Sequence, residues 1–193
     1  MRANSSAPTM KTWRKLAYSF GSLGAAVPYQ AVQTYIIFFY ADVMKLPIEL
    51  VGYTMILYGI WNAINDPLFG YLSDRTRTKW GRRIPYIVGG LVPLVLVFIF
   101  LWIPPFSAAD GNYIPLFVYF TVMMFLFDGL FTLVVLNWTA LFPEMFTSLE
   151  DRSMVSMWRQ LFGNVGLIIG IALAPTIYGK LGWQSMVIKF GII

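Results

Sequence analysis

The chain has 193 residues, of which 58% are hydrophobic and only 12% are charged, about half of the ~25% charged residues usual in soluble proteins. Such a composition leaves too few polar side chains to cover a surface in water, and it indicates a membrane protein. The chain contains no histidine and no cysteine, so by itself it supplies no Ser-His-Asp triad, no cysteine nucleophile and no Cys/His metal site.

Apolar stretches of about 20 residues are long enough, as helices, to cross the ~30 Å hydrocarbon layer of a bilayer. After a polar tail over residues 1–15, five such stretches are expected to span the membrane, at residues 16–40, 48–72, 84–103, 114–141 and 155–178. A sixth apolar run, residues 183–193, would cross only about half of a bilayer, and we expect an incomplete helix there. The sequence therefore predicts an all-α membrane protein with a bundle of transmembrane helices over residues 16–193.

Basic residues decide the expected orientation of these helices. They gather in the amino-terminal tail and in the connection after the second apolar run, whereas the connections on the other side contain only Lys45 and Lys180. Because Lys and Arg in short connections stay in the cytoplasm, we expect a cytoplasmic amino terminus and a multi-pass protein of the cell membrane. The net charge of +5 then reflects topology and predicts no nucleic-acid partner.

The second apolar run contains a carboxylate beside two amides. Asn62 and Asp66 are four residues apart and Asn65 adjoins them, so their oxygen-bearing side chains share one side of a helix. Pro67 lacks an N–H, so the carbonyl of Ala63 loses its helical partner. We expect Asp66, Asn62 and Asn65 to form a cation-coupling site for H⁺ or Na⁺. The alternative is that Asp66 only caps the helix or pairs with a charge near the cytoplasmic surface.

Two further ionisable residues, Asp128 and Arg159, lie inside the fourth and fifth runs. Each costs about 2.5–3.5 kcal/mol at the centre of a spanning helix, so both are expected to face protein or water rather than lipid. Carboxylate, hydroxyl, amide and indole groups together suit a polyhydroxylated ligand. An open alternative is a buried ion pair between Asp128 and Arg159 that binds nothing. The candidate substrate-binding residues are Asp128, Arg159, Trp138, Thr132, Thr139 and Gln33.

Three glycines, Gly163, Gly166 and Gly170, leave a strip without side chains along the fifth run. Such strips let helices approach closely within a membrane. We expect this strip to pack against another helix and to bind no ligand.

The connection over residues 70–83 combines an acidic residue with a basic cluster. Its basic residues orient the chain, and the cluster can also pair with acidic groups in one conformation and release them in another. Glu144, Glu150 and Asp151 in the next cytoplasmic connection are candidate partners. The expected residues of this conformational latch are Asp74, Arg75, Arg77, Arg82 and Arg83.

Residues 61–68, read together with residues 70–83, resemble the glycoside–pentoside–hexuronide:cation symporters, the melibiose-permease-like branch of the major facilitator superfamily. Residues 15–18, 142–144 and 150–159 are also similar to that family. The resemblance implies a twelve-helix fold of two halves. This chain would be the amino-terminal six-helix half with its sixth helix incomplete, and the carboxy-terminal half would be missing.

The resemblance also implies roles for individual residues. Asp66 matches the cation-coupling aspartate of the family, Asn65 a neighbouring asparagine, and Arg159 an arginine associated with the sugar pocket. Asn62 stands where melibiose-type members have a second carboxylate. A sodium site at Asp66 would therefore carry one negative charge less than the site of the melibiose-type members. No other metal site is expected.

These observations predict symport of a sugar or glycoside-like solute coupled to a cation, with no enzyme activity and no cofactor. A proton is favoured over sodium because one proton neutralises one carboxylate. A further alternative is symport of a lipid-like or other organic solute. A different class of function is a non-transporting membrane scaffold or a half-transporter that assembles with another chain.

Overall fold

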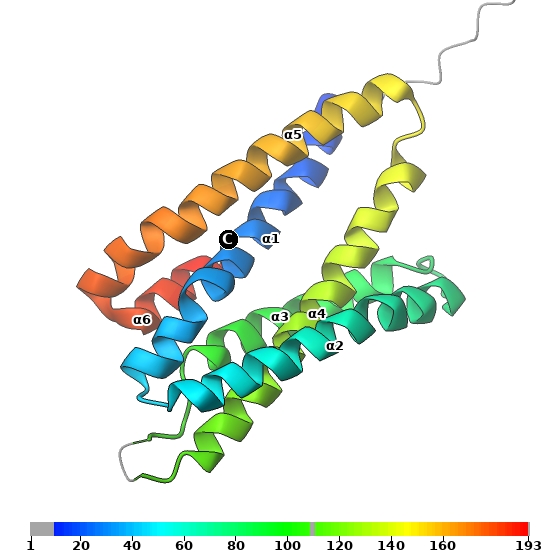
Figure 1. Ribbon diagram of the computed structural model, residues 1–193. Coiled ribbons are helices and arrows are strands. Elements are labelled where there is room, and N and C mark those ends of the chain that lie inside the picture. The colour runs from blue at the N-terminus through cyan, green and yellow to red at the C-terminus, as the bar shows by residue number, and fades with distance from the viewer. Residues whose placement is uncertain (1–9, 109–110, 193) are drawn as a thin grey trace, which may run out of the picture.

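The computed structural model describes residues 10–108 and 111–192, and this part of the chain is built from helices and their connections without strands (Figure 1). Two π-helical turns, η1 and η2, continue the helices that precede them. The elements are α1 Thr12–Phe38, η1 Phe39–Val43, α2 Ile48–Arg75, α3 Ile84–Leu101, α4 Ile114–Met145, α5 Leu149–Ile168, η2 Ile169–Leu173 and α6 Ala174–Ile192.

Local sequence explains several helix boundaries. The helices α3 and α4 have proline in their first turn, where the missing N–H costs nothing. Helix α5 begins after Ser148, whose hydroxyl accepts a hydrogen bond from the backbone N–H of Asp151 at 3.1 Å. Within α6, Gly182 adopts φ 80° and ψ 164°, a left-handed backbone conformation that suits glycine. The helix is kinked there, next to the expected start of the last apolar run at residue 183.

Three helical stretches among the described residues are long and apolar enough to cross a membrane, namely Ile84–Leu101, Ile114–Met145 and Leu149–Ile192. The helices α1 and α2 are also long, with 27 and 28 residues, but they carry more polar side chains. Two of the five expected spans, 16–40 and 48–72, therefore form long helices that are less apolar than the others. Polar residues in such helices must face protein or water.

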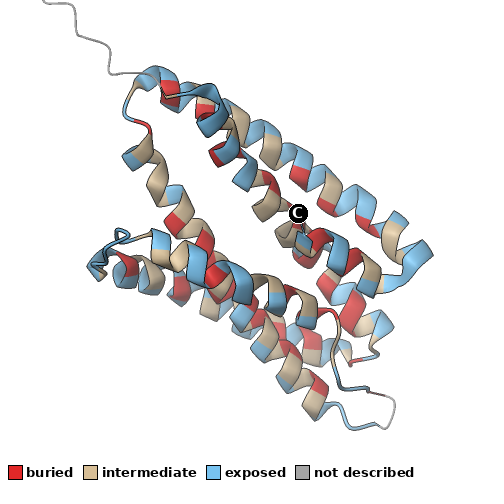
Figure 2. Ribbon diagram, turned by 180° about the vertical axis from the view of Figure 1, so that it is seen from behind, coloured by how far each residue is buried: buried red, intermediate tan, exposed pale blue. Residues whose placement is uncertain are grey.

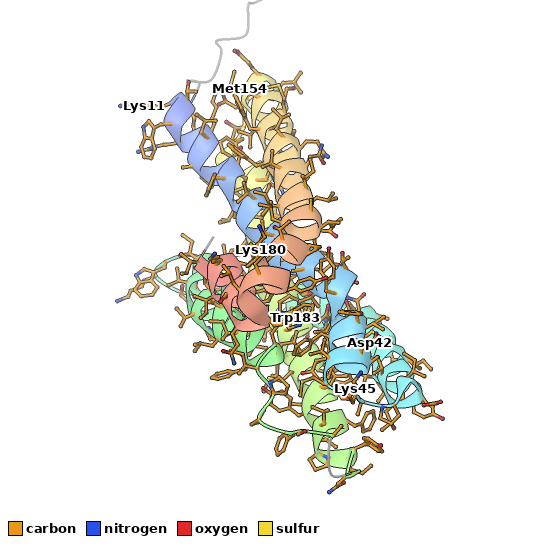
Figure 3. The ribbon with its side chains drawn as sticks, turned by 90° about the vertical axis from the view of Figure 1, so that its left-hand side faces the viewer. Lys11, Asp42, Lys45, Met154, Lys180 and Trp183 are labelled. Carbon is orange, nitrogen blue, oxygen red and sulfur yellow. The ribbon has the colours of Figure 1, made fainter. Side chains whose placement is uncertain are left out.

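The helices form two groups (Figure 1). In one group α1 packs along α5, and in the other α4 packs against both α2 and α3. Figure 2 shows that buried residues lie mainly where neighbouring helices face each other. The groups diverge towards the end at which α5 begins, and the last turns of α4 lean across to reach it. Figure 3 shows Lys11 and Met154 at that end, with Asp42 and Lys45 towards the other.

The glycine strip of the fifth apolar run packs against α1, as expected. A Cβ atom on Gly166 would lie 2.8 Å from Cβ of Ala26, and one on Gly170 would lie 2.9 Å from the carbonyl oxygen of Val27. Both distances are shorter than a normal contact, so the two backbones are as close as glycine allows. The prediction of close helix packing is confirmed.

Aromatic rings join the groups at the opposite end. Trp183, just after the kink, stacks on Tyr178 with centroids 4.0 Å apart and on Trp102 at the end of α3, 5.3 Å away. Phe39 of η1 packs against Trp183 at 5.1 Å. Such pairs add about 0.5–1.5 kcal/mol each beyond the area they bury. The cluster therefore ties η1, α3 and α6 together.

Substitution of the packed glycines, Gly166 of α5 and Gly170 of η2, should separate these elements from α1. We expect Gly166→Ala and Gly170→Ala each to lower the free energy of unfolding by about 1–3 kcal/mol, because the new methyl groups must push backbone atoms apart. The measurement is the thermal unfolding midpoint of the purified protein in detergent. Gly163→Ala is the matched control, because its nearest neighbour, Cβ of Ser22, is 4.0 Å away. Equal midpoints for all three variants would contradict this packing.

A candidate cation-coupling site between α2 and α4

A buried carboxylate, Asp128 of α4, lies against α2. Its side chain is only 3% exposed. Its Oδ1 accepts a hydrogen bond from Nδ2 of Asn62 at 3.2 Å, and its Oδ2 accepts one from Nδ2 of Asn65. The hydroxyl of Tyr58 also interacts with this carboxylate. All three groups belong to α2, and all three are neutral.

The second carboxylate, Asp66, lies on α2 itself and is more exposed than Asp128. Its Oδ1 accepts a hydrogen bond from the hydroxyl of Thr132 on α4 at 3.1 Å. The amides expected to surround Asp66 are instead turned towards Asp128. The physical reason is that Asn65, which is fully buried, faces α4, where it meets the deeper of the two acids.

The open alternative of an ion pair between Asp128 and Arg159 is not realised. The guanidinium of Arg159 lies over the ring of Trp138, 4.4 Å from its centroid, and its Nη2 is 3.4 Å from Oγ1 of Thr139. Two more rings, Tyr18 and Phe142, flank the same guanidinium at 5.8 and 5.5 Å. Arginine stacks well on aromatic faces, and these contacts are with residues towards the end of α4 rather than with Asp128.

A hollow of about 640 Å³ opens where α1, α2 and α4 meet. It brings together residues from both expected sets, the cation-coupling set and the substrate-binding set. Its volume falls within the range of about 300–1,000 Å³ that is typical of ligand pockets. The polar and aromatic residues that line it are Tyr29, Asn62, Asp66, Asp128, Phe131, Thr132 and Thr139.

The remaining candidates lie elsewhere. Trp138 packs against Gly21 of α1, with ring atoms 3.1 Å from where a Cβ would be. Arg159 borders a separate, shallow hollow with Gln160 and Asn164 of α5. Gln33 does not line the 640 Å³ hollow, and its Nε2 donates to the hydroxyl of Tyr58 at 3.2 Å.

The sequence analysis missed Tyr58. Its signal was spacing, because Tyr58, Asn62 and Asp66 follow one another at intervals of four residues and therefore share one side of α2. A tyrosine within an apolar run is ordinarily a packing residue, so the sequence alone assigns its hydroxyl no role. The partner of that hydroxyl depends on where α4 lies, which the sequence does not give.

The residues expected to act as a latch lie at the end where the helix groups diverge. Arg82 pairs with Glu144 at 2.7 Å, and Arg83 pairs with the same Glu144 at 3.1 Å and with Asp74 at 3.3 Å. The hydrogen bond and the charge of Glu144 raise the pKa of Arg82. Arg75 lies instead over the ring of Tyr71, 4.3 Å from its centroid, and the side chain of Arg77 is exposed.

The first turn of α5 makes a second set of contacts at this end. Asp151, a candidate partner of the basic cluster, pairs instead with Lys15 of α1, and both side chains are only 4% exposed. Asp151 also accepts a hydrogen bond from the backbone N–H of Met10 at 3.1 Å. Nε of Arg152 donates to the carbonyl of Phe146 at 2.7 Å. Glu144 in the last turn of α4 and Asp151 in the first turn of α5 therefore each pair within their own helix group.

Comparison with known proteins supplies the family. Residues 17–189 match the model of the MFS/sugar transport protein family. An uncharacterized symporter of Synechocystis sp. is 35% identical over 175 residues, which cover 90% of this chain and 32% of that relative. An isoprimeverose transporter of Lactiplantibacillus pentosus is 26% identical over 177 residues (91% and 36%). A sodium-dependent lysophosphatidylcholine symporter of Danio rerio is 24% identical over 171 residues (88% and 31%).

The chain spans about a third of the length of these curated relatives. The matches confirm the resemblance that residues 61–83 carry. Their names describe transporters and symporters, which agrees with long apolar helices and with a membrane location. The chain therefore belongs to the MFS/sugar transport protein family, whose members are membrane transporters of the symporter type and not enzymes.

Proposed function

We propose that this chain is the amino-terminal six-helix half of a symporter that couples a monovalent cation to the movement of a sugar or glycoside by alternating access. The observation that carries the proposal is the environment of Asp128. This buried carboxylate has only neutral hydrogen-bond partners on α2, and it shares a hollow with a second carboxylate, Asp66. In such a symporter a carboxy-terminal half would close the hollow from the opposite side.

A cation would act by relieving an electrostatic cost. Amide and hydroxyl donors compensate a buried carboxylate only in part, and a second carboxylate nearby adds repulsion. Binding of H⁺ or Na⁺ would remove part of that cost and stabilise the contact between α2 and α4. The expected preference for a proton rested on Asp66 alone. With Asp128 beside it, a sodium ion would meet two negative charges, so both ions fit the arrangement.

The proposed solute is a sugar or glycoside. Hydroxyl, amide and carboxylate groups beside the rings of Tyr29 and Phe131 suit a ligand with many hydroxyls and flat apolar faces. The isoprimeverose transporter among the relatives supports this choice. A lipid-like solute is the second candidate. Its support is that Phe131 and Val135 also line an adjoining apolar cavity of about 360 Å³, and that one relative is named for lysophosphatidylcholine.

We also propose that the end carrying Lys11, Lys15, Arg82 and Arg83 faces the cytoplasm of the cell. The support is that Lys11 lies at one end of the helices and Lys45 towards the other (Figure 3), while Lys15 pairs with Asp151 and Arg82 with Glu144 on either side of the connection between α4 and α5. Lys and Arg in short connections resist translocation.

Removal of either acidic charge should uncouple transport. In proteoliposomes containing the complete transporter, Asp128→Asn and Asp66→Asn should each lower uphill accumulation at least about tenfold, because each removes a charge that binds the ion. The measurement is uptake of labelled isoprimeverose and of lysophosphatidylcholine, each driven separately by a Na⁺ gradient and by a H⁺ gradient.

Asp42→Asn is the matched control for this experiment, since Asp42 lies in η1 outside the hollow. It should accumulate solute like the parent protein. Undiminished accumulation by both charge variants would overturn the coupling assignment. Absence of gradient-driven uptake in the parent protein would instead favour a scaffold or an assembling half-protein over a symporter of these solutes.

The cytoplasmic ion pairs are proposed to act as a latch that holds the α2–α3 connection against α4. Glu144→Gln should release both Arg82 and Arg83. Backbone amide exchange over residues 76–83, measured by mass spectrometry, should then become about threefold faster, a modest change because exposed ion pairs are weak. Glu150→Gln is the control and should exchange like the parent. A Glu144→Gln protein with unchanged exchange would refute the latch.

A further inference from the structure

We infer that the π-turn η2 is a hinge in the helical stretch that runs from α5 into α6, and that Tyr35 of α1 is the positioning residue that holds this hinge. The inference deepens the proposed function and rests on it, because alternating access needs the end opposite the cytoplasmic ion pairs to open. The apolar stretch Leu149–Ile192 is long enough to cross a membrane, but it is not one regular helix. The π-turn Ile169–Leu173 interrupts it, and the backbone kinks further along at Gly182.

A proline just after η2 removes one backbone hydrogen bond. Pro175 has no N–H, so the carbonyl of Ile171, four residues earlier, loses its α-helical donor. The hydroxyl of Tyr35 donates to this carbonyl at 2.5 Å. A side chain of α1 thereby takes the place of the missing backbone donor. Prolines and π-turns both mark positions where helices bend, and π-turns are frequent at functional sites.

The helix is fixed to α1 on one side of the hinge. Gly170, inside η2, lies so close to α1 that an added Cβ would be 2.8 Å from Cβ of Gln30 and 2.9 Å from the carbonyl oxygen of Val27. Gly166 of α5 packs on α1 in the same way, one turn earlier. This side of the hinge therefore has no room to move relative to α1.

The other side of the hinge is held more loosely. Residues 174–181, which we call the arm, run from η2 to the kink at Gly182. Within the arm, all of which the structure describes, Ala174 alone is buried. The ring of Tyr178 meets that of Tyr35 edge-on, with centroids 5.8 Å apart. The hinge thus joins a tightly packed segment to a loosely packed one.

The arm carries part of the aromatic cluster that ties the helix groups together at the end away from the ion pairs. Tyr178 stacks on Trp183, and Trp183 stacks on Trp102 at the end of α3. The helix groups lie close together at this end and diverge at the other (Figure 1). A swing of the arm about η2 would move Tyr178 relative to Trp183 and loosen the cluster. Tyr35 holds the arm in the position in which the cluster is closed.

Hydrogen–deuterium exchange of the complete, purified transporter, measured by mass spectrometry without solute, tests the role of Tyr35. The variant Tyr35→Phe keeps the ring but removes the donor, so backbone amides of the arm should exchange about fivefold faster, the effect of losing one hydrogen bond. Amides of residues 155–165 should exchange as in the parent. Tyr119→Phe is the matched control, because the hydroxyl of Tyr119 donates to a different carbonyl, that of Phe100, at 2.7 Å. It should leave exchange in the arm unchanged.

A second variant decides whether Tyr35 compensates for Pro175. Pro175→Ala restores a backbone N–H that can pair with the carbonyl of Ile171, so the arm should exchange about fivefold more slowly than in the parent. In the Pro175→Ala background, Tyr35→Phe should change exchange by less than about twofold. The same fivefold increase in both backgrounds, or parent-like exchange in Tyr35→Phe, would overturn the inference. If Tyr35→Phe does not fold, exchange that is not slowed in Pro175→Ala has the same meaning.

Transport separates a hinge from a merely structural contact. In the proteoliposomes described above, Pro175→Ala should lower the maximal uptake rate of the labelled solutes about fivefold, because the arm opens less readily, with the half-saturating concentration unchanged. A parent-like maximal rate would refute η2 as a hinge of transport, whatever the exchange result. If the hinge variants behave as expected while Asp66→Asn and Asp128→Asn accumulate solute normally, the hinge stands and the proposed coupling fails. If the parent takes up neither solute, the exchange comparison alone decides.

Discussion

A carboxylate inside a helix bundle must be compensated, and in this protein the compensation of Asp128 determines how α2 and α4 meet. Burial of an ionised group is tolerated only where donors or counter-charges replace water. Here the donors are two amides, those of Asn62 and Asn65, from one side of α2. In the rotation of α2 that these bonds stabilise, Asp66 and Thr132 face the hollow.

Two kinds of contact hold the helices, and they differ in how easily they can change. The contact between α1 and α5 depends on glycines whose backbone neighbours leave no room for a methyl group, so this pair is expected to move as one body. The contacts that link the pair to the other helices include the polar contact of Gln33 with Tyr58 and the stacking of Tyr29 on Phe131. A polar contact of this kind can be exchanged for another at small cost, which agrees with the proposed alternating access.

The sequence predicted the features that depend on local pattern. Apolar length predicted helices, the spacing of Gly166 and Gly170 predicted close packing, and residues 61–83 identified the family. What it missed depends on the rotation of one helix against another. The amides of Asn62 and Asn65 were assigned to Asp66 because all three residues share a side of α2. Helical spacing does not show that a carboxylate of another helix, Asp128 of α4, lies opposite these amides. Charge alone suggested an ion pair between Arg159 and Asp128. In the structure the rings of Trp138, Tyr18 and Phe142 flank the guanidinium of Arg159 instead.

The separation in sequence between the partner helices has a consequence for how the protein is made. The amides of α2 and the carboxyl group of Asp66 leave the ribosome more than 60 residues before Asp128 and Thr132. The interval between the synthesis of α1 and that of the glycines that pack against it is longer still. During that interval these polar groups enter the lipid without their final partners, which is costly. Early helices of this kind depend on an insertion machinery or a membrane chaperone that shelters them until synthesis has delivered the later ones.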